Sequence, residues 1–217
     1  MIDLQRFFEN HFDTGRISDN KLRRFSEAHL RLLATNDPEE RYTQLLEEAT
    51  LAHTTYYGSQ VDEDVKFAVQ QGYTKRKDSL FERFQSLVSQ KEGIIRGTFG
   101  KDTPEYEEFF PQGLLEYSNA TLSTIDTLMD RMVAAAENYE DRLGKDLCNL
   151  FVDIRDEYAR IRQAQMEKKG EVSESKADSE ATRDVLETCL MRNVLLIAAD
   201  HIGQPERVSQ FFDQSVL

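Results

Sequence analysis

The chain has 217 residues, of which 40 are acidic and 27 are basic, so its formal net charge at pH 7 is −13. Hydrophobic residues make up 39% of the sequence, which is enough to fill a core and excludes a collagen-like or fully disordered chain. No run of about 18 uncharged apolar residues occurs, so we expect a soluble protein without a membrane span.

Helical spacing of apolar residues dominates the first half of the chain. Residues 2–12 predict a short helix that Gly15 ends, and residues 18–35 predict a second helix. Asp37 is expected to cap a third helix, with Pro38 in its first position. Interruptions are expected at Gly58 and Gly72, because glycine weakens a helix interior. A longer helix is then predicted over residues 74–96.

Two further amphipathic helices are predicted over residues 114–138 and 141–168. Residues 168–180 are polar and rich in Ser and acidic side chains, which predicts a mobile linker or long loop. Residues 194–199 are apolar on every side, so this helix is expected to be buried on several faces near the C-terminus. Together these patterns predict one all-α domain over residues 1–217, a bundle of about six to eight helices.

The cysteines and the first residues indicate the compartment. Cys148 and Cys189 are 41 positions apart without Cys or His neighbours, which favours neither a disulfide scaffold nor a zinc site. Acidic residues occur within the first ten positions, and segment 1–8 lacks the apolar core of a signal peptide. We therefore expect a cytoplasmic protein.

The charge distribution argues against polyanionic partners. Both halves of the chain are acidic, and the densest basic cluster is Lys75-Arg76-Lys77, which is interpreted as a solvated helix face. Neutralising phosphates requires a basic surface. We accordingly expect neither nucleic acid nor an anionic membrane as a partner.

The sequence lacks the common catalytic and metal-binding motifs. The four histidines are not in Glu-x-x-His or His-Glu-x-x-His patterns, which place two metal ligands on one helix face. Gly-x-Ser-x-Gly, the nucleophile motif of many hydrolases, is also absent. No metal and no cofactor is expected, and an enzymatic activity is not favoured.

His53 is the histidine whose setting best fits a binding site. It lies on an apolar stripe with Tyr42 and Tyr56, and Tyr57 is close by. One interpretation is a histidine at the core edge, satisfied by a hydroxyl or a carboxylate. The other is a ligand cavity in which His53 is the polar group and Tyr42, Tyr56 and Tyr57 are the walls.

The segment 106–117 is the candidate interaction surface, because it places several aromatic residues around Pro111 and Gly113. Such a loop either plugs the core or forms an exposed contact patch. The residues proposed for the patch are Phe109, Phe110, Leu114 and Tyr117.

Two functional hypotheses follow from different classes. The first is a non-enzymatic helical protein that acts through protein–protein contacts or self-association, which agrees with the absence of catalytic motifs. The second is a helical-bundle enzyme or small-ligand binder with its cavity near His53. A closed, polar-lined cavity around His53 would favour the second hypothesis.

Overall fold

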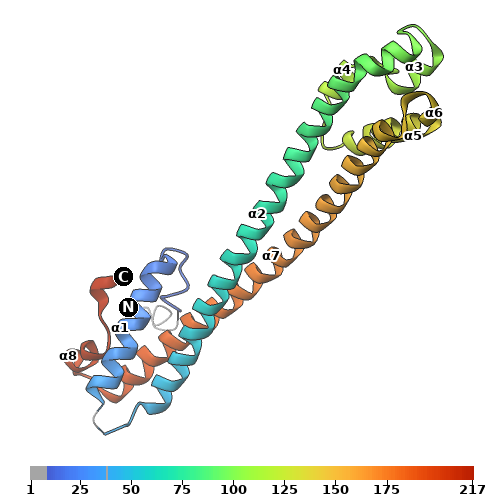
Figure 1. The fold of residues 1–217 in the computed structure, drawn as a ribbon. Coiled ribbons are helices and arrows are strands. Elements are labelled where there is room, and N and C mark those ends of the chain that lie inside the picture. Colours follow the sequence, from blue (N-terminus) through green and yellow to red (C-terminus); the bar gives the residue numbers. More distant parts are fainter. Residues whose placement is uncertain (1–8, 38) are drawn as a thin grey trace. The chain divides into compact units, whose positions relative to one another are not determined.

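A computed structural model describes residues 9–37 and 39–217. These residues form eight α-helices and short 3-10 turns, and no strand occurs among them, which confirms the all-α prediction (Figure 1). No helix in this part of the chain combines the length and the apolar character that crossing a membrane requires. Most of the helix predicted over residues 2–12 lies outside the described residues.

The chain divides into two compact units, each with its own hydrophobic core. Unit 1 comprises Met1–Val65 and Val172–Leu217, and unit 2 comprises Lys66–Glu171. Both boundaries fall inside long helices, α2 (Thr43–Phe99) and α7 (Lys145–Asp200). That the whole chain acts as a single domain stays a prediction.

Unit 1 begins with α1 (Asp19–Asn36), which matches the predicted second helix. The Ser18 hydroxyl accepts a hydrogen bond from the backbone N–H of Lys21 and so caps the helix. Leu22, Phe25 and Leu33 recur at intervals of three, four or multiples of them and are buried on one face. The unit is completed by parts of α2 and α7, and by three short elements: α8 (Pro205–Val208), η2 (Ser209–Phe211) and η3 (Gln214–Val216).

Side-chain hydrogen bonds in unit 1 show that α2 and α7 run antiparallel. The Tyr42 hydroxyl donates to Asp200, and the hydroxyls of Ser59 and Thr182 lie 2.8 Å apart. Later positions on α2 therefore pair with earlier positions on α7. A core of Leu, Phe, Tyr and Ile side chains fills the space between α1, these helices and the short C-terminal elements.

The predicted linker at residues 168–180 is wrong in its secondary structure, because the whole segment belongs to α7. The sequence contains Lys, Glu and Ala, which favour helices, and no Pro. Within unit 1, Ser175 is buried and its hydroxyl donates to Asp62 Oδ2 over 3.1 Å. The polar composition of this segment therefore does not imply a loop, because small residues with hydroxyl groups form the buried face of the helix.

The predicted breaks at Gly58 and Gly72 are also wrong, because α2 continues through both positions. Each glycine costs a helix interior about 1 kcal/mol relative to alanine, which favourable neighbours can outweigh. The Asp37 carboxylate does act near the start of α2, where it accepts from the backbone N–H groups of Arg41 and Tyr42. Pro38 lies outside the described residues.

The helix around residues 194–199 is buried on one face, not on several as predicted. Ile197 is fully buried, whereas Leu195 and Leu196 are 44% and 42% exposed. The reason is that the rest of unit 1 packs against only one side of this end of α7. An all-apolar sequence therefore leaves two leucines in contact with solvent.

Unit 2 contains the remaining parts of α2 and α7 and four shorter helices, which are α3 (Pro104–Phe109), α4 (Leu115–Ser118), α5 (Ile125–Asn138) and α6 (Glu140–Leu143). The helix predicted over 114–138 is thus two helices, separated by a turn in which Thr121 and Thr124 bond each other. Gly144 has a φ of 87° and separates α6 from α7. A densely aromatic core fills this unit.

Candidate functional site

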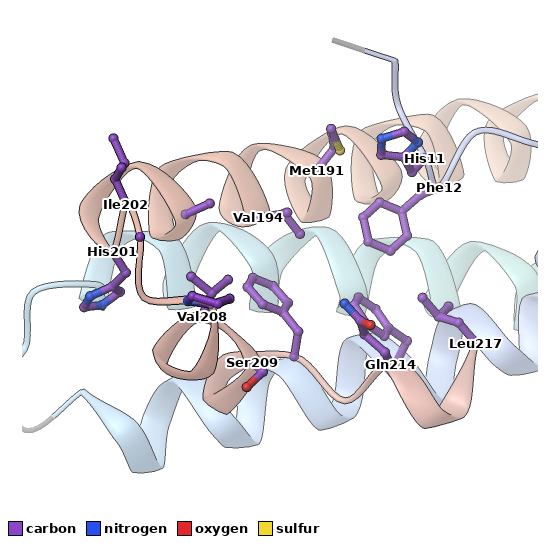
Figure 2. Close-up of a pocket in the computed structure, with 15 residues that line it drawn as sticks. His11, Phe12, Met191, Val194, His201, Ile202, Val208, Ser209, Gln214 and Leu217 are labelled. Atoms are coloured by element: carbon purple, nitrogen blue, oxygen red, sulfur yellow. The ribbon is translucent and has the colours of Figure 1, made fainter. Parts of the chain in front are cut away.

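Unit 1 contains a pocket with a volume of about 720 Å³, which we call the apolar pocket (Figure 2). It lies between the end of α7, residues 11–12 and the segment 205–217, which we call the tail. The lining residues are His11, Phe12, Phe25, Met191, Val194, Ala198, His201, Ile202, Gly203, Pro205, Val208, Ser209, Phe212, Gln214 and Leu217.

One wall of the apolar pocket is a face of α7. Met191, Val194 and Ala198 are spaced three and four residues apart, so their side chains share one side of the helix. The helix ends at Asp200, and Gly203 turns the chain back with a φ of 77°. Ile202 precedes this turn at the rim of the pocket and is 83% exposed.

The opposite wall is the tail, in which Pro205 begins α8. Val208 and Phe212 line the pocket from this side, as Figure 2 shows for Val208. Phe212 is buried, and its ring stacks on that of His29 with 4.5 Å between centroids. Phe211 is buried too and packs edge-on against Tyr42.

Three side chains of α1 donate hydrogen bonds to main-chain carbonyls of the tail. His29 Nδ1 donates to the Phe211 carbonyl over 2.8 Å, and Asn36 Nδ2 donates to the Gln210 carbonyl over 2.7 Å. The Lys21 ammonium donates to the Leu217 carbonyl. The tail is therefore fastened to α1 at three points along its length.

His29 is fully buried behind the pocket and pairs with Asn193 of α7. A carbonyl oxygen only accepts, so the proton of the neutral imidazole sits on Nδ1, and Nε2 accepts from Asn193 Nδ2 at 3.1 Å. Burial lowers the pKa of His29 to about 4, although the bond to Phe211 acts in the opposite direction. The Asn193 Oδ1 atom is buried and has no hydrogen-bond partner in the described part of the chain.

A polar cluster lies at the His201 end of the pocket. The Tyr42 hydroxyl donates to Asp200 Oδ2 over 3.1 Å and is 3.4 Å from His201 Nε2. Arg41 forms an ion pair with Asp200 at 2.6 Å. Burial and the neighbouring carboxylate of Asp200 raise the pKa of Tyr42. Asp200 is thus engaged by Arg41 and Tyr42 and does not line the pocket.

Three of the four residues of the predicted ligand site meet on the side of α2 that faces α1. His53 Nδ1 lies 2.8 Å from the Ser26 hydroxyl, and the His53 ring lies 4.7 Å from that of Tyr57. The Tyr56 hydroxyl donates to the Asp19 carboxylate. Tyr42 precedes Tyr56 by 14 residues, which is about 21 Å along the helix axis, so it does not join these three residues.

This arrangement favours the core-edge interpretation of His53. Its imidazole has a hydroxyl partner, and burial lowers the pKa of His53, with Glu27 opposing the change. The Tyr57 hydroxyl donates to the Asp19 carbonyl over 3.2 Å. None of the four residues lines the apolar pocket. The cavity expected around them stays a prediction.

The proposed interaction patch lies in the core of unit 2. Phe109, Phe110 and Tyr117 are almost fully buried, and Leu114 packs against the same core. The Tyr117 hydroxyl donates to the Phe109 carbonyl over 2.7 Å, which folds the segment onto itself. These side chains therefore plug the core and do not form an exposed patch. Removing their large aromatic surfaces from water stabilises the folded chain.

Metal-ligating side chains do not cluster in the described residues, where no group of three or more His, Cys, Asp or Glu could hold an ion. Cys148 is buried in unit 2 and Cys189 is half-buried in unit 1, and both are free thiols.

His29 was not among the residues that the sequence predicted for a site. It follows Phe25 by four positions and precedes Leu33 by four, so it lies on the buried stripe of α1. Its place on this stripe was the signal in the sequence that could have identified His29 as a buried histidine. Asn193 and the tail carried no comparable signal, because their roles depend on contacts between segments far apart in the sequence.

Comparison with protein-family models found no match to this chain, and comparisons with curated proteins and with solved structures found none either.

Proposed function

We propose that unit 1 binds a small, neutral, largely apolar organic molecule in the apolar pocket. The observation that carries this proposal is a pocket of about 720 Å³ that no acidic or basic side chain other than histidine lines in the described part of the chain. Pockets for small organic ligands commonly have volumes of roughly 300–1,000 Å³ and mostly apolar walls.

The lining defines the class of ligand. Phe12, Phe25 and Phe212 offer aromatic surface, and Met191 can adapt to irregular shapes. A charged group on the ligand would lose its hydration without gaining a counter-ion, which is unfavourable. The occupant is therefore expected to be neutral over most of its surface.

Polar groups at the edges of the pocket would orient such a ligand. Figure 2 shows His11 and His201 at opposite ends of the labelled set, with Ser209 and Gln214 along the tail. Imidazole, hydroxyl and amide groups can each bond a hydroxyl or carbonyl. A molecule with an apolar body and one or two such groups matches this pattern.

A binding titration tests the proposal. The neutral dye Nile red is titrated with the protein, and its fluorescence reports transfer to an apolar environment. Ala198→Trp should fill part of the pocket and weaken dye binding by about tenfold or more, equivalent to roughly 1.4 kcal/mol. Leu51→Trp is the matched control, because Leu51 is exposed on α2 and does not line the pocket. Equal affinities for the two variants and the unmodified chain would refute the proposal.

A second candidate is the protein–protein contact favoured by the sequence. Ile202 is 83% exposed at the rim, and Leu195 is 44% exposed on the same helix as the α7 wall. An apolar side chain of a protein partner, or of a second copy of the chain, could use the same surface. Sedimentation velocity of the chain and of Ile202→Ser tests self-association, because loss of a dimer in the variant alone would favour this candidate.

Neither candidate involves a chemical reaction, a nucleic acid or a membrane. A cytoplasmic location remains the expectation from the cysteines and the first residues.

A further inference from the structure

We propose that the tail keeps its place as a wall of the apolar pocket through His29, which is the positioning residue that holds it there. The inference rests on the proposed function of the pocket and concerns how that pocket keeps its shape.

The tail depends on contacts with the rest of unit 1. It supplies six of the 15 lining residues, namely Pro205, Val208, Ser209, Phe212, Gln214 and Leu217. Its only regular elements are α8, with four residues, and two 3-10 turns of three residues each. Elements this short are marginal by themselves, so contacts with the rest of unit 1, including the hydrogen bonds from α1, must stabilise their position.

The three fastening bonds are unequal. The donors Asn36 and Lys21 bond the tail in exposed surroundings, where water competes for the same carbonyl groups. The bond from His29 to the Phe211 carbonyl is buried. Breaking a buried bond leaves an unsatisfied polar group, which costs more than losing an exposed bond. His29 is therefore the principal fastening.

His29 also connects the two walls of the pocket. Its Nδ1 bonds the tail at Phe211, and its Nε2 accepts from Asn193 on α7, two residues from Met191 and one from Val194. Its ring stacks on Phe212, which lines the pocket directly. One imidazole thus sets the separation of the α7 wall and the tail wall.

Two measurements on the full chain test this role. The first is the rate of trypsin cleavage after Arg207, which is exposed within α8 and is cut faster when the tail detaches. The second is the affinity for Nile red. We expect His29→Ala to raise the cleavage rate and weaken dye binding, each by about tenfold, as the loss of one buried bond predicts.

Leu22→Ala is the matched control for general destabilisation. Leu22 is fully buried on the same helix, and it neither lines the pocket nor bonds the tail. It should lower the stability of unit 1 with less than a threefold change in cleavage or affinity. His29→Asn places an amide donor near the position of Nδ1 and should restore part of the protection of Arg207.

The outcomes separate this inference from the proposed function. Equal cleavage after Arg207 in His29→Ala and Leu22→Ala would overturn the positioning role, even where Nile red binds the unmodified chain. If His29→Ala alone speeds cleavage after Arg207 but the unmodified chain does not bind the dye, the fastening stands and the proposed function fails.

Discussion

His29 and Asn193 are separated by 164 residues in the chain and meet in the core of unit 1, where His29 Nε2 and Asn193 Nδ2 lie 3.1 Å apart. Both side chains are fully buried. Through this pair, α1 is joined to the helix that forms one wall of the apolar pocket, and His29 also holds the tail that forms the other.

Asn193→Ala should lower the free energy of unfolding by about 1–3 kcal/mol. The change leaves His29 Nε2 buried without its donor and removes packed atoms. Urea denaturation monitored by circular dichroism measures the effect. Asn149→Ala, at an exposed position of the same helix, is the control and should change stability by less than about 0.5 kcal/mol. Equal effects would contradict the importance of the buried pair.

The stability of unit 1 should fall with acidification through His29. The pKa of His29 is about 4 in the folded protein and about 6.5 when unfolded, so between these values only the unfolded chain binds the proton. The stabilisation is complete above pH 6.5 and is lost as the pH falls to about 4. Its size is about 3 kcal/mol, because each pKa unit corresponds to roughly 1.4 kcal/mol.

His29→Asn isolates this contribution, because asparagine does not titrate. The free energy of unfolding of both proteins is measured with urea between pH 7 and pH 4. Because both proteins have the same carboxylates, the contribution of those groups cancels in the difference. The difference between their stabilities should shrink as the pH falls. Parallel curves would show that His29 titrates equally in the folded and unfolded states.

Leu195→Asp should be tolerated, whereas Ile197→Asp should prevent unit 1 from folding. Leu195 keeps 44% of its surface exposed, so an aspartate there remains hydrated and costs roughly 1 kcal/mol. Ile197 is fully buried, and a charge at that position would lack a partner. Thermal melting of both variants checks the contrast. Loss of cooperative melting in Leu195→Asp would restore the sequence-based expectation of a helix buried on several faces.

Gly170→Ala should stabilise the chain by about 0.5–1 kcal/mol, because alanine is the better helix former. Gly170 lies inside α7, and an added Cβ would meet no atom within 4 Å. Gly144→Ala is the contrasting variant, since a φ of 87° strains any residue with a side chain. Thermal melting should move the two variants in opposite directions. A destabilised Gly170→Ala would indicate that residues 168–180 are not helical.

Periodicity predicted the fold class and the face of α1, because Leu22, Phe25 and Leu33 repeat at the helical interval. It failed at Gly58 and Gly72, where the weak helix propensity of glycine predicts a break that does not occur. Tertiary contacts determine those positions, since α2 continues through both. The plug formed by Phe109 and Phe110 was one of two interpretations that composition left open, and burial decided between them.

The pocket lay beyond what the sequence could indicate. Its walls come from residues 11–12, from the end of α7 and from the tail, and only folding brings them together. The sequence favoured His53 because tyrosines lie near it along the chain, whereas His29 has its partners in Phe211 and Asn193, more than 160 residues away. The spacing of residues along the sequence does not reveal partners this far apart.

Ligand binding in the apolar pocket is tested most directly by a methyl-resolved NMR titration of the full chain with 1-decanol, a neutral molecule with an apolar body and one hydroxyl. We expect saturable shifts at Met191, Val194 and Leu217, which line the pocket, and none at Leu51 on the exposed surface of α2. Shifts confined to other methyl groups, or no saturable shift, would contradict the assignment of a ligand site to the apolar pocket.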